Sequence, residues 1–346
     1  MSWHASKGSV LKSGGQGLPE NHDGVRVAAL DLGSQTFRMV LAECVSSGPV
    51  IVESVLENCR LGEGVASDGC LDSAAVERCL GVLKGFALRL ERFRPDRVIA
   101  VGTAALRNAV NSGFFLERAG EYGFDISILT GRQEAGLAAR GAAAAVECGK
   151  EQTFLSLDVG GGSTEIALCR GSVVLAFRSL AFGAVSMTER FIHGGSRLES
   201  FASMERFVRE GMAGDVDALK SAGACPARLV ASGGTATTVA AMLLELEEYR
   251  PDLVRGLLAS AESLEIIVKR LALMTPEQKR AVKGLEPARA DVIEAGITIM
   301  LAVMRLFDFD KTEISDGGLL LGLLLTEFEK ETDCHVEPSC ARSLYF

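Results

Sequence analysis

The chain has 346 residues, of which 48% are hydrophobic and 23% are charged. This balance supplies a large core and excludes a mainly disordered protein. With 45 acidic against 36 basic side chains the net charge is -9, which excludes a general nucleic-acid coat protein because phosphate backbones require a basic footprint. At this length we expect about two domains.

No hydrophobic signal segment is present in residues 1–24, which are expected to form a flexible tail, as are residues 331–346. The longest apolar run, Leu319–Leu325, is far shorter than the roughly 20 residues of a membrane span. The nine cysteines contain no CxxC pair and are expected to be free thiols. We therefore expect a cytoplasmic protein with no membrane and no nucleic-acid partner.

Two segments of the chain follow one pattern. Each has an apolar strand that ends in an aspartate, Asp31 or Asp158, then a turn rich in Gly, Ser and Thr, and then a second apolar strand. This pattern is typical of a β-hairpin whose turn needs close backbone approach. Because the two aspartates are about one domain length apart, a duplicated domain is the economical explanation.

Strands and helices alternate through the rest of the chain. The apolar periodicity predicts strands at Val50–Leu56, Arg97–Thr103, Asp125–Leu129, Val173–Leu180, Arg228–Ala231 and Glu313–Ser315. It predicts helices at Ser73–Phe93 with Ser73 as N-cap, Asn108–Tyr122, Gln133–Val146, Met187–Phe191, Ser203–Leu219, Gly233–Leu246, Leu257–Met274, Pro287–Phe307 and Leu319–Glu329. A capping box is expected at Thr275–Gln278.

This order predicts an α/β protein whose sheets are covered by helices. We expect a first domain at residues 25–146, completed by a C-terminal helix within 305–330, and a second domain at residues 147–304.

The two hairpin turns have the composition of phosphate-binding loops. Their backbone N–H groups can hold a phosphate chain between two domains, and the aspartate that ends each strand can hold Mg²⁺ together with phosphate oxygens. The duplication favours this interpretation over two purely structural hairpins. The candidate phosphate-binding residues are Gly33, Ser34, Gln35 and Thr36 in the first turn and Gly160, Gly161, Gly162, Ser163 and Thr164 in the second.

Seven residues after each aspartate the two copies differ, with Arg38 in the first and Glu165 in the second. An odd offset puts two residues on opposite faces of an ideal strand, but the turn resets that phase. Arg38 can neutralise phosphate, and Glu165 can complete a metal or water site. A solvent-exposed arginine and glutamate are the structural alternative.

On these residues the chain resembles the exopolyphosphatase / guanosine pentaphosphate phosphohydrolase (Ppx/GppA) family, which lies within the actin-like ATPase superfamily. The most specific feature is Gly160–Glu165 in combination with Thr130–Ala135. Other matching stretches are Asp31–Arg38, Arg60–Gly62, Gly102–Arg107, Phe182–Ala184, Ser232–Thr235 and Arg289–Asp291. The resemblance implies two ribonuclease-H-like domains around a central cleft, and we also expect a homodimer.

The resemblance also implies residue roles. Glu134 matches the family's catalytic glutamate, which orients and deprotonates a water in line with the leaving oxygen; stabilisation of a helix start is its structural alternative. Arg107 matches a phosphate-contacting arginine, and a surface arginine is the alternative there. Asp158 and Glu165 match the positions linked to Mg²⁺ and activated water, and Asp31 is a further candidate metal ligand.

The resemblance assigns Ser232, Gly233, Gly234 and Thr235 to a loop beside a nucleoside or phosphate, and a plain strand-to-helix turn is the alternative. Three departures from the family pattern stand out: Gln35 and Thr36 in place of Asn and Ser, the apolar run within Gly318–Gly322, and Glu294 at a usually apolar position. We expect no counterpart here to the long C-terminal helical extension of larger members.

Residues 266–292 carry an excess of basic side chains, which predicts either a track for a polyanion or a solvated helix face. The function expected from the whole sequence is Mg²⁺-dependent hydrolysis of the terminal phosphoanhydride of inorganic polyphosphate. Alternatives are guanosine pentaphosphate 5'-phosphohydrolysis, phosphate transfer to an organic acceptor, or non-catalytic sensing of guanosine polyphosphates.

Overall fold

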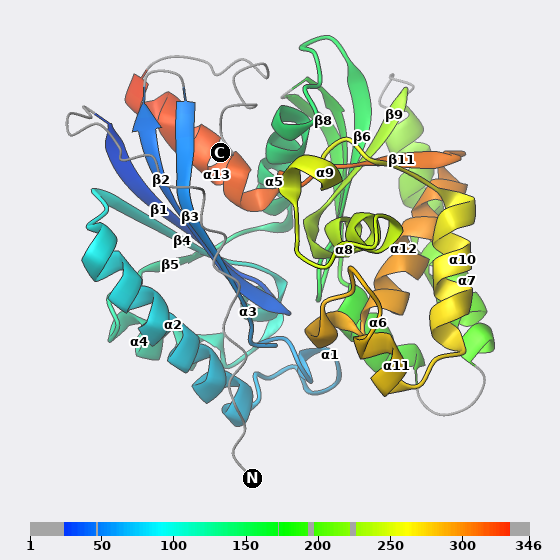
Figure 1. Ribbon diagram of the computed structural model, residues 1–346, viewed down its shortest axis with the longest axis horizontal. Coiled ribbons are helices and arrows are strands. Elements are labelled where there is room, and N and C mark those ends of the chain that lie inside the picture. Colours follow the sequence, from blue (N-terminus) through cyan, green and yellow to red (C-terminus); the bar gives the residue numbers. More distant parts are fainter. Residues whose placement is uncertain (1–23, 46–47, 172, 193–196, 222–225, 333–346) are drawn as a thin grey trace.

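The computed structural model describes residues 24–45, 48–171, 173–192, 197–221 and 226–332, so the two predicted tails fall almost entirely outside it. Two mixed β-sheets stand side by side, each covered by helices (Figure 1). The first has the strand order β3-β2-β1-β4-β5. Its strands are β1 (Val25–Leu32), β2 (Thr36–Val45), β3 (Gly48–Asn58), β4 (Arg97–Gly102) and β5 (Ile126–Ile128).

The second sheet has the order β10-β11-β9-β6-β7-β8. Its strands are β6 (Thr153–Val159), β7 (Thr164–Arg170), β8 (Val173–Leu180), β9 (Arg228–Ser232), β10 (Leu258–Ser260) and β11 (Lys311–Ile314). In both sheets an antiparallel three-stranded meander pairs with a parallel strand through its first strand. The shared topology confirms the α/β fold class with two ribonuclease-H-like units.

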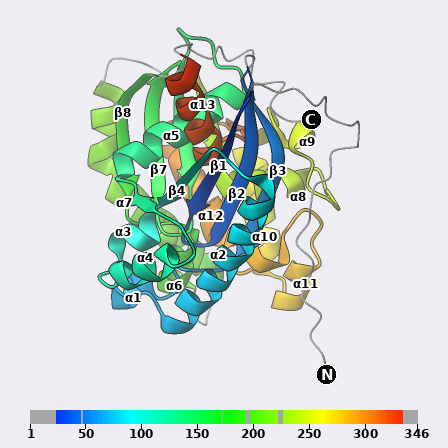
Figure 2. The ribbon, with the colours of Figure 1, turned by 90° about the vertical axis from the view of Figure 1, so that its left-hand side faces the viewer.

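Helices of the first half are α1 (Val65–Asp68), α2 (Ser73–Phe93), α3 (Ala104–Asn108), α4 (Ser112–Gly120) and α5 (Gly131–Ala145). Those of the second half are α6 (Ala184–Phe191), α7 (Arg197–Ser221), α8 (Gly233–Leu243), α9 (Pro251–Val254), α10 (Ala261–Ala272), α11 (Pro276–Arg280), the 3₁₀ turn η1 (Pro287–Arg289), α12 (Ile293–Leu306) and α13 (Leu319–Thr332). Each sheet has its own core. Helices α2 and α4 cover the outer face of the first sheet (Figure 2), and α7 and α12 pack on the second.

Helices α5 and α13 lie against each other between the two sheets (Figure 1). Their backbones approach closely at glycines: a Cβ on Gly141 would lie 2.0 Å from the Gly318 carbonyl oxygen, and one on Gly322 would lie 2.0 Å from the Leu137 carbonyl oxygen. Leu321 packs on α5, so the run within Gly318–Gly322 is a helix-packing surface.

This arrangement corrects the predicted domain boundaries. The stretch 305–330 is divided, because β11 pairs with β9 in the second sheet, and only α13 packs on the first, with Leu324 and Phe328 against β1 and β2. Helix α5, predicted to belong to the first domain, also packs on β6, β7 and β8.

Three predicted helices begin later in the chain than expected, and Met187–Phe191 and Ser203–Leu219 begin earlier, as α6 and α7. The predicted helix Asn108–Tyr122 begins at Ser112 as α4, because Ala109 is extended after the end of α3 and the Asn111 side chain bonds the backbone of Leu71. The predicted Leu257–Met274 starts as strand β10 and becomes helical after Ser260 caps it. The predicted Pro287–Phe307 begins with η1, and only α12 is α-helical.

Helix caps were predicted with mixed success. The N-cap of α2 is Asp72 rather than Ser73, since the Asp72 carboxylate accepts from the Ala75 N–H at 3.0 Å. The capping box of Thr275 and Gln278 is confirmed. Of the cysteines, the six in described positions are free thiols.

Candidate active site

The two predicted phosphate loops meet where the units touch. In each loop the first glycine donates its N–H to the carbonyl three residues on, Gly33 to Thr36 at 3.1 Å and Gly160 to Ser163 at 3.0 Å. The loops are in direct contact: a Cβ on Gly162 would lie 2.6 Å from the Ser34 Oγ. Glycine is therefore required on the second loop because a side chain would push the loops apart.

An aspartate is the second-last residue of each strand that leads into a loop, and the cross-strand partners of the two aspartates differ in charge. Asp31 lies directly opposite Arg38, and Asp158 lies opposite Glu165, so the turns do reset the strand phase. Burial raises the pKa of Asp31 to about 7; Arg38 opposes this rise, while Glu134 and Asp158 add to it. The carboxylates of Asp31, Asp158 and Glu134 are therefore close enough to affect the protonation of Asp31.

Glu165 is only 3% exposed, and the Ser179 hydroxyl donates to its Oε1 at 2.8 Å. Burial, with the nearby charges of Glu134 and Asp158, raises its pKa well above the ordinary value for a glutamate. The interpretation of Glu165 as a solvent-exposed residue is wrong.

Glu134 lies in the first turn of α5 and is buried. The hydrogen-bonded cap at this end of the helix is made by Thr130 and Gln133, which form a complete capping box without Glu134. Instead its Oε2 accepts from Nη1 of Arg107 at 2.7 Å. Burial raises the pKa of Glu134, and the Arg107 hydrogen bond opposes the rise.

Arg107 lies in the last turn of α3. The same Nη1 also donates to the Leu129 carbonyl at 2.8 Å, which holds the guanidinium between α3 and the start of α5. Arg107 is therefore a half-buried cation held beside the carboxylate, rather than an arginine that points only into solvent.

The loop Ser232–Thr235 shapes the site through its glycines. Gly233 has φ 81°, and a Cβ there would lie 2.1 Å from Oδ1 of Asp158. The Thr235 hydroxyl is buried and donates to the Val159 carbonyl at 3.1 Å, so that side chain serves the fold. Ser232 is buried, and its Oγ has no hydrogen-bond partner.

Two predicted phosphate-binding side chains are directed elsewhere. The Thr164 hydroxyl is buried and donates to the Phe182 carbonyl at 2.8 Å. The Gln35 amide donates to the Ala288 carbonyl at 3.2 Å. Both side chains therefore donate to backbone carbonyls of the protein itself.

Arg289 is at the site but was not predicted as a site residue. It is buried, and its guanidinium occupies the space beside Gly234, where a Cβ would lie 2.3 Å from Nη1. Burial and the nearby Arg38 lower the pKa of Arg289, so two cations stand close together at the site. Its signal in the sequence was the stretch Arg289–Asp291, one of those that carry the family resemblance.

The predicted basic track over residues 266–292 is not continuous. Lys269, Arg280 and Lys283 are exposed and paired with Glu265, Glu277 and Glu247. The solvated-face alternative describes these three residues. Lys279 and Arg289 are buried.

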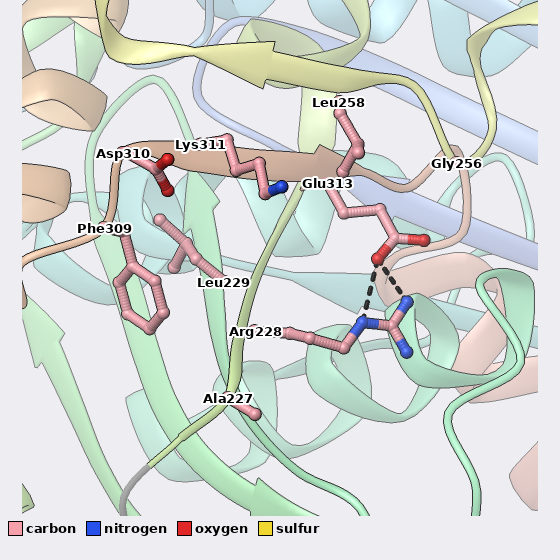
Figure 3. Close-up of a pocket in the computed structure, with 9 residues that line it drawn as sticks. All are labelled: Ala227, Arg228, Leu229, Gly256, Leu258, Phe309, Asp310, Lys311 and Glu313. Carbon is pink, nitrogen blue, oxygen red and sulfur yellow. Dashed lines mark hydrogen bonds and ion pairs between the residues drawn. The ribbon is translucent and has the colours of Figure 1, made fainter.

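A separate cavity of about 340 Å³ lies at the edge of the second sheet, between β9, β10 and β11 (Figure 3). The Arg228 Nε donates to Oε2 of Glu313 at 2.9 Å along one wall, and Leu229, Leu258 and Phe309 supply apolar surface. The lining contains neither phosphate loop and none of the predicted site residues.

Mg²⁺ fits the residues present at the loops. Among the described residues, no group of three or more His, Cys, Asp or Glu side chains could hold a metal ion by itself. Mg²⁺ usually needs only one or two carboxylates, with phosphate oxygens and water completing its shell. Asp31 and Asp158 can supply these, and Oδ1 of Asp31 is buried without a hydrogen-bond partner.

Residues 40–331 match the model of the Ppx/GppA phosphatase family. The chain belongs to this family. A crystal structure of the Aquifex aeolicus member of the Ppx/GppA family superposes with a TM-score of 0.74 at 30% identity, over 89% of this chain and 99% of that one. A Cytophaga hutchinsonii exopolyphosphatase superposes with a TM-score of 0.81 at 25% identity, over 88% and 98%.

One curated Ppx/GppA relative is a Vibrio atlanticus protein named guanosine-5'-triphosphate,3'-diphosphate pyrophosphatase. It is 28% identical over 310 residues, which are 88% of this chain and 60% of that protein. The chain thus spans about 60% of the length of this curated relative. None of the helices in the described ranges has the length and apolar character needed to span a membrane.

Glu294, the charged residue at a position expected to be apolar in a Ppx/GppA protein, is completely buried. It is paired with Lys279 and Arg197. The departure is therefore accommodated by two cations that neighbouring helices bring to it.

Proposed function

We propose that the chain hydrolyses the terminal phosphoanhydride bond of inorganic polyphosphate with Mg²⁺. The observation that carries this proposal is the buried Glu134, held by Arg107 at 2.7 Å beside two contacting phosphate loops. Binding alone needs no such carboxylate, whereas hydrolysis needs a base that positions and deprotonates water.

Each group in the site then has a chemical task. Backbone N–H groups of both loops hold phosphate oxygens, and Arg38, Arg107 and Arg289 neutralise their charge. Asp31 and Asp158 would hold Mg²⁺, which when bound neutralises charge on the phosphate oxygens. Glu134 accepts the proton of the attacking water as the oxygen–phosphorus bond forms, and the shortened chain leaves with the bridging oxygen. Glu165 orients the water.

Guanosine pentaphosphate is the second candidate substrate. The adjacent arginines Arg38 and Arg289 favour it, because two neighbouring cations can bind a phosphate group in addition to the one that is hydrolysed. The name of the Vibrio relative is in keeping with this chemistry. The predicted homodimer and cytoplasmic location stay predictions.

Phosphate release by the purified protein tests the proposal. Long polyphosphate, tripolyphosphate, guanosine pentaphosphate and ATP are compared with Mg²⁺ and with EDTA, and Glu134→Gln is assayed in parallel. We expect release from polyphosphate that is lost with EDTA and in the variant. Release only from guanosine pentaphosphate would favour the second candidate. Binding without release would indicate a sensor, and transfer only to an added alcohol would indicate a phosphotransferase.

A further inference from the structure

Residues 281–292, here called the bridging loop, connect α11 to α12 and cross to the first unit. The Ala288 carbonyl at the tip of the loop accepts from the Gln35 amide at 3.2 Å and from the Arg60 guanidinium at 2.9 Å. Since Gln35 belongs to the first phosphate loop, the bridging loop contacts the phosphate site directly.

Further bonds strengthen this crossing. Asn58 donates to Oε1 of Glu286 at 2.5 Å, and Arg60 forms an ion pair with Asp291 at 2.7 Å. The backbone N–H of Arg60 donates to the Gln35 carbonyl at 3.0 Å. The end of β3 and the first phosphate loop are therefore joined to the bridging loop as one network.

The two ends of the bridging loop are held by a buried ion pair. Lys279 in the last turn of α11 is 2% exposed, and Glu294 in the first turn of α12 is 0% exposed. The Lys279 ammonium bonds Oε2 of Glu294, and the Arg197 guanidinium reaches the same oxygen at 2.7 Å.

Stability alone does not explain a buried ion pair such as Lys279–Glu294. Removing two charges from water is costly, and an apolar pair of similar volume often stabilises a fold at least as well. Oε1 of Glu294 is also buried without a hydrogen-bond partner, a further cost. An ion pair with hydrogen bonds fixes the relative positions of its two side chains, because the carboxylate accepts donors only in defined directions.

We propose that Glu294 is a positioning residue for the phosphate site. Its bond to Lys279 joins the two ends of the bridging loop and its bond to Arg197 anchors them to α7. This holds Arg289 beside Gly234 and near Arg38, and it holds the Ala288 carbonyl against Gln35 and Arg60. The expected effect of Glu294 on substrate binding rests on the proposed hydrolase function, whereas its expected effect on the bridging loop does not.

Hydrogen–deuterium exchange tests the loop without any substrate. Glu294→Gln keeps the shape of the side chain and removes its charge. Glu247→Gln is the matched control, because Glu247 pairs with Lys283 of the same loop at 2.8 Å but is exposed. We expect faster exchange in residues 281–292 and 58–64 of Glu294→Gln only. Unchanged protection in this variant would overturn the proposal.

Kinetics with tripolyphosphate test the substrate part. We expect Glu294→Gln to raise KM about tenfold with a much smaller change in kcat, as for a lost phosphate contact. In an Arg289→Gln background the same substitution should raise KM by much less, because a large part of its effect passes through Arg289. Equal effects of Glu294→Gln in both backgrounds would show a merely structural role.

Two further results distinguish a failure of this proposal from misfolding of the variant and from a failure of the proposed function. If Glu294→Gln does not fold, Glu294→Asp keeps the charge and shortens the side chain, and the same rise in KM and the same faster exchange are expected; wild-type values in both would overturn the proposal. If the wild-type protein releases no phosphate from any substrate, the proposed function fails, while the exchange experiment still decides whether Glu294 holds the loop.

Discussion

Nη1 of Arg107 lies 2.7 Å from Oε2 of Glu134, joining the end of α3 to the first turn of α5. The bond leaves the other carboxylate oxygen of Glu134 to act on water, and it opposes the rise in pKa that burial causes. The pair therefore sets both the position and the protonation state of the proposed base.

Replacement of Glu134 should abolish catalysis without unfolding the protein. We expect Glu134→Gln to lower kcat for phosphate release by a factor of about 10²–10⁴, the usual contribution of a positioned general base. Glu117→Gln, at an exposed position on α4, should keep full activity. Retained activity in Glu134→Gln, with a normal melting temperature, would remove Glu134 from the mechanism.

The acid limb of the pH profile should report Glu134. A general base is active when deprotonated, so kcat/KM should fall as the pH drops through a pKa raised above the ordinary 4.5. Arg107→Gln removes the group that lowers this pKa, so the limb should move to higher pH. Arg132 is exposed in the first turn of α5, the turn that also contains Glu134, and Arg132→Gln should leave the acid limb in place. A limb that moves to lower pH in Arg107→Gln contradicts this assignment.

Contact between the phosphate loops should depend on Gly162. The Cβ of Gly162→Ala would lie 2.6 Å from the Ser34 Oγ, so we expect KM for polyphosphate to rise about tenfold as the loops separate. Gly85→Ala in α2 meets no atom within 4 Å and should raise stability by about 0.5–1 kcal/mol, with KM unchanged. Titration with tripolyphosphate and thermal melting measure the two effects; an unchanged KM in Gly162→Ala would show that the loops tolerate separation.

The cavity beside Arg228 should contribute to stability rather than to hydrolysis. Arg228→Leu leaves the Glu313 carboxylate without its bonds, which we expect to cost about 2 kcal/mol of unfolding free energy, as for hydrogen bonds to charged groups. Phosphate release should stay at the wild-type rate, because the lining includes neither phosphate loop. A selective loss of activity at full stability would place part of the site there.

Features encoded by neighbouring residues were predictable. The two hairpins are where the alternation of apolar residues and the glycine turns indicated, and the same turns set Asp31 opposite Arg38 and Asp158 opposite Glu165. Such pairs follow from turn length and strand period. Helix ends were less predictable, because tertiary bonds compete with helix propensity, as the Asn111 side chain does at Leu71.

The α/β fold, the duplicated hairpins and the carboxylates and glycines of the phosphate loops are predictable from the sequence, because each depends on local periodicity and turn chemistry. The packing of α5 on α13 through Gly141 and Gly322, and the burial of Arg289 beside Gly234, are visible only in the folded molecule. Those contacts join residues far apart in the chain, and they depend on how two separately cored units dock, which no local pattern records.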